Sequence, residues 1–198
     1  SQGEGLTAGP YVTDDFGECD APLALRRHVR AFFQGNRYLI RRLVDHVIGQ
    51  VPAAGRVLDL YAGAGLFSVT AARRTGAAMT AVEGDRFAAE DLAANAGRAV
   101  ATIKSDVESF LSTRADDSPF DAAIVDPPRT GLSREALDGL LGLKVARIVY
   151  VSCDVATLAR DARAIVGVGY RVASAEAFDM FPNTPHVETV VVFDRTPG

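Results

Sequence analysis

The residue in this 198-residue chain best suited to attack a substrate is Cys153. It lies in Val151-Ser152-Cys153-Asp154, where an apolar strand is expected to end and a helix to begin. The positive end of a helix dipole favours a thiolate over a thiol, so this position is typical of a nucleophile rather than an inert core cysteine. The other cysteine, Cys19, lies in a stretch without periodicity. We therefore expect Cys153 alone to react.

A carboxylate that could act as a base follows near the C-terminal end. Glu188 opens an apolar strand, where a carboxylate is costly to bury unless it has a partner or a function. The alternative is a charge that protects an edge strand from aggregation. His186 is the rival base, because residues two apart in a strand face the same side. A carboxylate with a pKa near 4.3 is already ionised at neutral pH, which favours Glu188.

A third pattern, Asp126-Pro127-Pro128-Arg129, predicts a stiff wall beside these groups. Two prolines after a strand-ending aspartate fix the shape of a turn before any ligand binds. Such a wall could hold a planar base against a cofactor. The alternative is a rigid turn with a solvated aspartate.

A glycine-rich loop at 62–65 predicts a nucleotide-type cofactor site. Small residues there let the backbone approach a ligand, and the helix that follows offers free N–H groups. Glu83 lies 20 positions after Gly63, which suits an acidic residue that binds ribose hydroxyls. Both NAD and S-adenosylmethionine fit this pattern, and an ordinary strand–helix turn is the third reading.

Alternating strands and helices must position these residues. We expect strands at 56–60, 78–83, 101–104, 121–126, 147–152, 170–178 and 187–194. We expect helices at 36–48, 66–74, 86–98, 107–112, 133–141 and 155–166. The alternation predicts a parallel sheet covered by helices, with ligands outside the carboxyl ends of its strands. The last two strands are joined without a helix, which favours an antiparallel hairpin. Residues 1–24 are expected to be a loose lead-in, and 25–33 to be helical or irregular.

Composition limits the classes of function. The formal charge of −4 predicts weak RNA binding by these residues alone. No apolar run could span a bilayer and no signal peptide is recognisable, so a cytoplasmic location is the default expectation. The two cysteines lack the spacing of a metal site, so we expect no metal, and we expect a monomer.

Five motifs together resemble the RNA (uracil-5-)-methyltransferase family over roughly residues 30–194. They are Phe32-Phe33-Gln34-Gly35-Asn36, Asp59-Leu60-Tyr61 with its glycine loop, Asp126-Pro127-Pro128-Arg129-Thr130-Gly131, Ser152-Cys153-Asp154, and Asp179 to Glu188. The resemblance implies an α/β, Rossmann-like, seven-stranded S-adenosylmethionine-dependent methyltransferase fold with a mostly parallel sheet and an antiparallel last strand. It implies methyl transfer from S-adenosylmethionine to carbon 5 of a uridine in tRNA or rRNA.

The same resemblance implies roles for individual residues. Cys153 is the nucleophile and Glu188 the base, and the residues that contact the cofactor or line its pocket are Gln34, Tyr61, Glu83, Asp106 and Asp126. Residues 25–198 correspond to the catalytic domain, and the RNA-binding barrel that usually precedes it has no counterpart here. Two alternatives stay open: a cofactor-binding fragment that is inactive alone, and an NAD-dependent oxidoreductase.

Overall fold

The computed structural model describes residues 10–15, 23–30, 36, 38–113, 120–184 and 186–196, and its main feature is a seven-stranded sheet. The strands of this sheet, in chain order, are β3 (Arg56–Leu60), β4 (Ala78–Glu83), β5 (Val100–Lys104), β6 (Ala122–Val125), β7 (Arg147–Ser152), β8 (Tyr170–Phe178) and β9 (Glu188–Arg195). The helices are α1 (Ile40–Gly49), α2 (Leu66–Thr75), α3 (Arg86–Ala96), α4 (Val107–Ser112), α5 (Arg134–Gly142) and α6 (Val155–Gly167).

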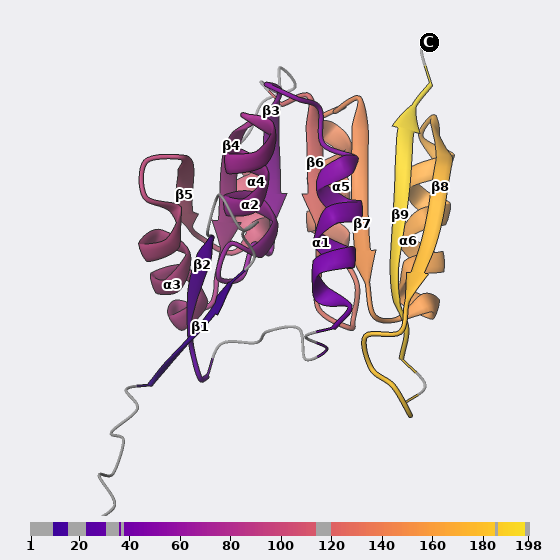
Figure 1. Cartoon of the computed structure of the whole chain (residues 1–198). Helices are drawn as coiled ribbons and strands as arrows, with labels where there is room; N and C mark the ends of the chain where they lie inside the picture. The colour runs from indigo at the N-terminus through magenta and orange to yellow at the C-terminus, as the bar shows by residue number, and fades with distance from the viewer. Residues whose placement is uncertain are drawn as a thin grey trace, which may run out of the picture.

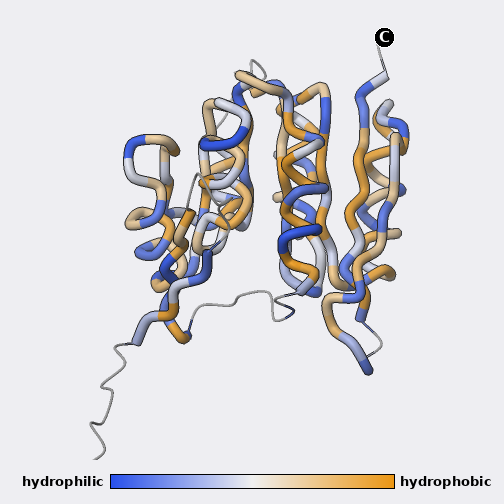
Figure 2. Tube along the Cα trace, in the orientation of Figure 1, coloured by the Kyte–Doolittle hydropathy of each residue, from blue (hydrophilic) through white to orange (hydrophobic). Residues whose placement is uncertain are grey.

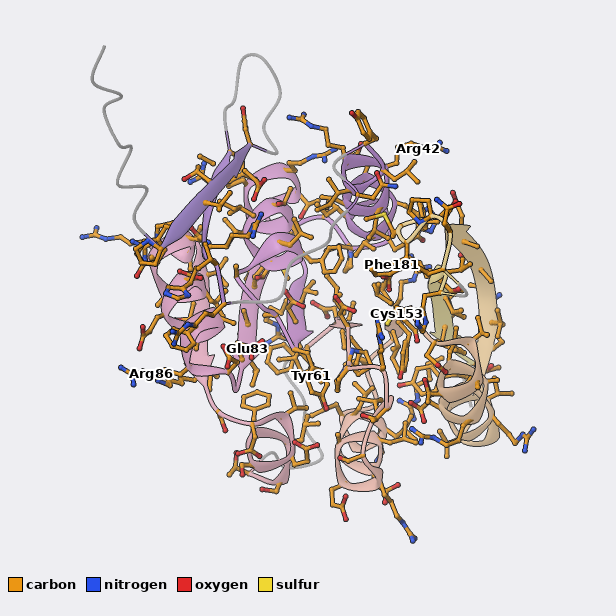
Figure 3. The ribbon with its side chains drawn as sticks, turned by 90° about the horizontal axis from the view of Figure 1, so that it is seen from below. Arg42, Tyr61, Glu83, Arg86, Cys153 and Phe181 are labelled. Carbon is orange, nitrogen blue, oxygen red and sulfur yellow. The ribbon has the colours of Figure 1, made fainter. Side chains whose placement is uncertain are left out.

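The helices form a layer on each side of the sheet. Helices α1, α2 and α3 cover one face, and α4, α5 and α6 cover the other (Figures 1 and 3). Successive strand residues therefore enter two different cores. Val149 and Val151 pack in the first, whereas Ile148 and Tyr150 pack in the second. Burial on both faces explains why the central strands are almost continuously apolar (Figure 2).

The sheet topology confirms the predicted fold class. The strand order is β5-β4-β3-β6-β7-β9-β8; β5, β4, β3, β6 and β7 run parallel, and β9 is antiparallel to both its neighbours. The predicted hairpin of the last two strands is thus confirmed. The sequence pattern did not indicate that β9 would insert between β7 and β8 rather than lie at the edge.

The N-terminal region differs from the prediction. Strands β1 (Tyr11–Asp15) and β2 (Ala24–His28) pair as an antiparallel hairpin, so the expected loose lead-in is wrong at 11–15 and the expected helical or irregular segment is wrong at 24–28. Leu23 and Leu25 are buried on either side of the exposed Ala24, which is the alternation of a strand. The hairpin spans the domain boundary expected at residue 25.

The hairpin lies beside α3 (Figure 1), and polar side chains of α3 attach it to the rest of the molecule. The Asn95 amide accepts a hydrogen bond from the Arg26 backbone N–H at 2.9 Å and donates to the Arg26 carbonyl at 2.7 Å. It also donates to the carbonyl of Ala64, in the glycine loop, at 2.8 Å. Asp91, one turn earlier, accepts from the His28 N–H. One helix face therefore joins the hairpin to the loop.

Helix α1 begins at Ile40, four residues later than expected from the apolar pattern. The reason is Asn36, whose side-chain oxygen accepts a hydrogen bond from the Tyr38 N–H at 3.1 Å. An asparagine that binds backbone two residues ahead favours a turn over a helix.

We predict that Asn95→Ala weakens the attachment of the hairpin. The change leaves backbone groups of Arg26 and Ala64 without their partner, which should lower the free energy of unfolding by about 1–3 kcal/mol. Urea denaturation followed by circular dichroism would measure it. The control is Glu90→Ala on the same helix, which removes only an exposed pair with Arg86 and should cost less than about 1 kcal/mol. Equal stability of the two variants would contradict the prediction.

Candidate functional site

A cavity of about 740 Å³ lies at the carboxyl ends of the parallel strands. Five of the predicted site residues line it: Tyr61, Glu83, Asp126, Cys153 and Glu188. They come from the ends of β3, β4 and β6, the start of α6 and the start of β9. Figure 3 views the molecule from this edge and shows Glu83, Tyr61 and Cys153 contributed by different parts of the sheet. The placement of Glu83, Asp126, Cys153 and Glu188 around one crevice, expected from the polar residues at the strand ends, is confirmed.

The glycine loop forms one wall and has the backbone that close approach requires. Gly63 has φ +57°, and a Cβ atom there would have no heavy atom within 4 Å, so the loop leaves open space. Gly65 has φ +93°, and a Cβ there would lie 2.7 Å from a methyl of Val69 and 2.9 Å from one of Leu92. Gly65 is therefore required by conformation and by packing with α2 and α3.

Glu83 fastens this loop to the next one. One carboxylate oxygen accepts a hydrogen bond from the Gly63 N–H at 2.7 Å, and the other accepts from the Asp85 N–H at 2.7 Å. A carboxylate has about four acceptor positions, so further donors such as hydroxyls could still bind. Beneath the loop, the fully buried Asp59 accepts from the Ser68 N–H at 3.0 Å. Burial raises the pKa of Asp59 to about 7.

Asp106 and Tyr61 occupy different positions relative to the cavity. Asp106 is exposed and caps α4, accepting a hydrogen bond from the Ser109 N–H at 2.7 Å, which lowers the pKa of its carboxyl. Among the described residues that line the cavity, Asp106 is not found, although its Cα lies only 3.3 Å from a Cβ built on Gly84, next to Glu83. Tyr61 has φ +61° and lines the cavity. Burial raises the pKa of its phenol.

Strand register brings Cys153 and Glu188 together. In the antiparallel pair of β7 and β9, Ser152 is opposite Thr189. Continuing this register by one residue places Cys153 opposite Glu188, and side chains directly opposite on neighbouring strands lie about 5 Å apart at Cβ. Glu188 is 1% exposed and Cys153 is half-buried. The predicted nucleophile and the predicted base therefore face one space.

The electrostatic environment of Cys153 does not favour the thiolate that the sequence position predicted. Burial, and then the charge of Glu188, raise the pKa of the Cys153 thiol. A hydrogen bond and the positive charge of Arg129 act in the opposite direction. The direction is therefore opposite to the lowered pKa expected at a helix start, because burial, the largest cause, and the nearby carboxylate Glu188 favour the neutral thiol.

Asp126 experiences a similar environment. Burial raises the pKa of its carboxyl well above the ordinary value, and the charges of Glu188, Asp59 and Glu83 raise it further. Several carboxylates thus share one cavity, and they disfavour one another's ionised forms. A ligand that carries positive charge would relieve this repulsion.

Two arginines of the cavity were not singled out from the sequence. Arg30 follows β2, and Arg129 belongs to the Asp126-Pro127-Pro128-Arg129 segment. The position of Arg129 inside a rigid motif was a signal that could have identified it. Arg30 gave no such signal, because its position depends on the unpredicted hairpin.

Two further predicted residues, Gln34 and His186, are not among the described residues that line the cavity. Gln34 lies outside the described residues, so its role stays a prediction. His186 is half-buried, its ring centroid lies 6.4 Å from that of Phe181, and it is not among the described cavity residues. Across the described part of the chain there is no cluster of potential metal ligands and no helix long and apolar enough to cross a membrane.

A family model described as tRNA (uracil-5-)-methyltransferase matches residues 8–196. The chain belongs to this family. The resemblance seen in its motifs is therefore confirmed.

Individual relatives are longer than this chain. The chain is 41% identical to an uncharacterized RNA methyltransferase of Thermotoga maritima, over 81% of the chain and 37% of that protein. It is 37% identical to the 23S rRNA (uracil(1939)-C(5))-methyltransferase RlmD of Pseudomonas putida, over 98% of the chain and 44% of that protein. It superposes on the Pyrococcus abyssi tRNA (uracil-54, C5)-methyltransferase in complex with S-adenosyl-L-homocysteine, with a TM-score of 0.79 and 31% identity, over 93% of this chain and 44% of that one. The chain spans less than half the length of each.

We predict that Cys153 titrates above an ordinary cysteine and that Glu188 is one cause. In a Cys19→Ser background, the rate of alkylation by iodoacetamide should rise with pH to a midpoint above about 8.5, the unperturbed value. Glu188→Gln removes a negative charge that opposes the thiolate, so the midpoint should move to lower pH. Glu135→Gln, on an exposed position of α5, is the control and should leave it unchanged. A midpoint that stays in place or rises in Glu188→Gln would show that the carboxylate does not face the thiol.

Proposed function

We propose that this chain is the catalytic part of an S-adenosylmethionine-dependent methyltransferase that modifies carbon 5 of a uridine in tRNA or rRNA. The observation that carries the proposal is that Cys153, directly after β7, and Glu188, at the start of the neighbouring β9, line one cavity together with the glycine loop and Glu83. A nucleophile and a base beside a cofactor loop are what this reaction needs.

The cavity fits S-adenosylmethionine better than NAD. Its lining includes the carboxylates Glu83, Asp85, Asp126 and Glu188. These four carboxylates outnumber the two arginines of the described lining, Arg30 and Arg129, so a sulfonium and an ammonium group suit it better than the diphosphate of NAD, which would add negative charge. The open space at Gly63 suits a ligand that approaches the backbone closely.

The residues proposed to hold the cofactor are Tyr61, Glu83 and Asp126 from the described cavity, and Gln34 and Asp106 from the resemblance. Glu83 would accept hydrogen bonds from ribose hydroxyls with its remaining lone pairs. When bound, S-adenosylmethionine supplies an electrophilic methyl group and leaves as S-adenosylhomocysteine.

Cys153 would activate the uracil ring. Carbon 5 of uracil is a poor nucleophile by itself. The Cys153 thiolate forms a bond to carbon 6, and the electron pair of the carbon 5–carbon 6 double bond moves into the ring to give an enolate, which makes carbon 5 nucleophilic. Because the pKa of Cys153 is raised, the thiol must release its proton to solvent before or as it adds to carbon 6, and Arg129 would stabilise the thiolate.

Glu188 would complete the reaction after carbon 5 has been methylated. Its carboxylate takes the proton from carbon 5, the electron pair re-forms the carbon 5–carbon 6 double bond, and the bond from carbon 6 to sulfur breaks to release Cys153 as thiolate. The uridine must be unpaired or flipped out, since a stacked base cannot present carbon 6 to a thiol. The pair of prolines after Asp126 would wall this pocket.

A second candidate is a cofactor-binding fragment that is inactive without further protein. The observation that favours it is that the chain spans 37–44% of the relatives described above. Methyl transfer by these 198 residues, compared with a longer form of the protein, would separate the two.

The proposed function predicts a covalent complex through Cys153. RNA isolated from cells grown with 5-fluorouracil, incubated with the chain and S-adenosylmethionine, should give an adduct that survives denaturing electrophoresis, because fluorine cannot leave carbon 5 as a proton does. The adduct should disappear in Cys153→Ala and remain in Cys19→Ala. Trapping that persists in Cys153→Ala would overturn the assignment.

The cofactor assignment predicts that Glu83→Ala weakens S-adenosylmethionine binding. Loss of charge-assisted hydrogen bonds to ribose should cost about 1.5–3 kcal/mol, or roughly tenfold or more in Kd. Titration calorimetry would measure the change, with Glu90→Ala as the exposed glutamate control. Unchanged affinity in Glu83→Ala would contradict the assignment.

The role of Glu188 predicts what accumulates when it is replaced. In Glu188→Gln, addition and methylation can proceed while elimination stalls, so ordinary uridine RNA should give a methylated covalent complex, detected by mass spectrometry. His186→Ala should still turn over. If Glu188→Gln turns over normally and His186→Ala accumulates the adduct, His186 is the base.

A further inference from the structure

A buried carboxylate on α6 binds three different parts of the molecule. Asp161 is fully buried. One of its oxygens accepts hydrogen bonds from the Leu132 backbone N–H at 2.9 Å and from the Tyr150 hydroxyl at 2.7 Å. The other accepts from the side chain of Arg160 at 2.8 Å. A carboxylate buried in this way is stable only while its donors are in place.

The neighbouring side chains of α6 hold the loop that follows β6. Arg160 donates to the backbone carbonyls of Thr130, at 3.2 Å, and Leu132, at 2.9 Å. The Thr157 hydroxyl, one turn earlier on the helix, donates to the carbonyl of Arg129 at 3.2 Å. Three carbonyls and one N–H of segment 129–132 are thus bound by one face of α6, which we call the α6 clamp (Thr157, Arg160, Asp161).

The α6 clamp leaves no space for a side chain at Gly131, the centre of the loop. Gly131 has φ +72°, and a Cβ there would lie 2.6 Å from a guanidinium nitrogen of Arg160 and 2.7 Å from a carboxylate oxygen of Asp161. The loop can approach α6 this closely only with glycine at 131. The fit makes the loop conformation specific rather than one of several.

The same helix begins beside the reactive thiol. Cys153 precedes α6 by two residues, and Arg129, at the near end of the clamped segment, lies in the same cavity lining as Cys153. The clamp therefore joins the helix that follows Cys153 to the loop that contains Arg129.

We propose that Asp161 is a positioning residue that, through Arg160 and the backbone of Leu132, holds the 129–132 segment so that Arg129 stays against Cys153. It touches no reacting atom and acts through Arg129. The consequence for function rests on the proposed role of Cys153 as nucleophile. A carboxylate that only stabilised the fold would leave the reactivity of the thiol unchanged.

The test is the pH profile of Cys153 alkylation in a Cys19→Ser background, which needs neither RNA nor methyl donor. Tyr150→Phe removes one donor to Asp161, and Asp161→Asn removes its charge. Both should move the midpoint to higher pH and slow alkylation at neutral pH by about threefold to tenfold, since one pKa unit is a factor of ten.

A matched control exists on the neighbouring part of the sheet. Tyr170 is also buried, and its hydroxyl donates to the Val145 carbonyl at 2.8 Å, away from the thiol. Like Tyr150→Phe, Tyr170→Phe removes a buried phenol oxygen. It should lower the melting temperature by a similar amount and leave the pH profile of Cys153 alkylation unchanged. If Tyr150→Phe behaves like Tyr170→Phe, the clamp is structural only and the proposal is wrong.

Dependence on Arg129 gives a second criterion. Arg129→Gln should itself raise the midpoint, and adding Tyr150→Phe should then shift it little further, because both changes act through one interaction. Additive shifts would overturn the proposal.

Failure of the proposed function is a separate result. It would appear as no adduct between the unaltered chain and 5-fluorouridine RNA, and it would not change the alkylation result. Tyr150→Phe keeps the test available if Asp161→Asn does not fold.

Discussion

The antiparallel insertion of β9 between β7 and β8 is the constraint on which the site depends. In an all-parallel sheet every strand starts at the edge away from the ligands, so a base at the start of a strand could not meet a nucleophile at the end of another. Reversal of β9 brings Glu188 to the carboxyl edge. Its register is set by packing, because Val190 and Phe193 are buried in different cores. A slip of one residue would exchange these side chains between the cores. The packing of β9 therefore fixes the position of Glu188 beside the end of β7, which Cys153 directly follows.

Charge concentrated at this edge has a second consequence. Asp59, Glu83, Asp126 and Glu188 come from four different strands or their ends, and the fold cannot separate them because parallel strands end at one edge. Burial first, and then repulsion from neighbouring carboxylates, raises the pKa values of Asp59 and Asp126. A cationic ligand in the cavity would relieve this repulsion. The preference for a positively charged cofactor follows from strand topology as much as from any single side chain.

Most of the fold could be derived from the sequence, and so could the position of Glu83, Asp126, Cys153 and Glu188 at one edge of the sheet, for identifiable reasons. Strands buried on both faces are continuously apolar, and small or polar residues at their ends mark the turns, so β3, β4 and β7 have the predicted bounds. The hairpin of β1 and β2 was missed because short strands containing charged residues lack a periodic signal. Its stability comes from long-range bonds to α3, which no local pattern encodes. Asp106 was placed at the correct edge but is occupied in capping α4, and Gln34 remains a prediction.

The α6 clamp illustrates a class of residue that local sequence patterns do not identify. Asp161 is polar, sits in the middle of an amphipathic helix and gives no motif, so its burial is visible only once β7, α6 and the loop after β6 are assembled. Together with Arg160, it binds α6 to the loop that follows Pro127 and Pro128. In the proposed role, this would keep Arg129 beside Cys153 and set the electrostatic environment of the thiol before substrate arrives. A thiol with a raised pKa needs this more than one that is already ionised, because the anion it forms on substrate binding must find its counter-charge in place.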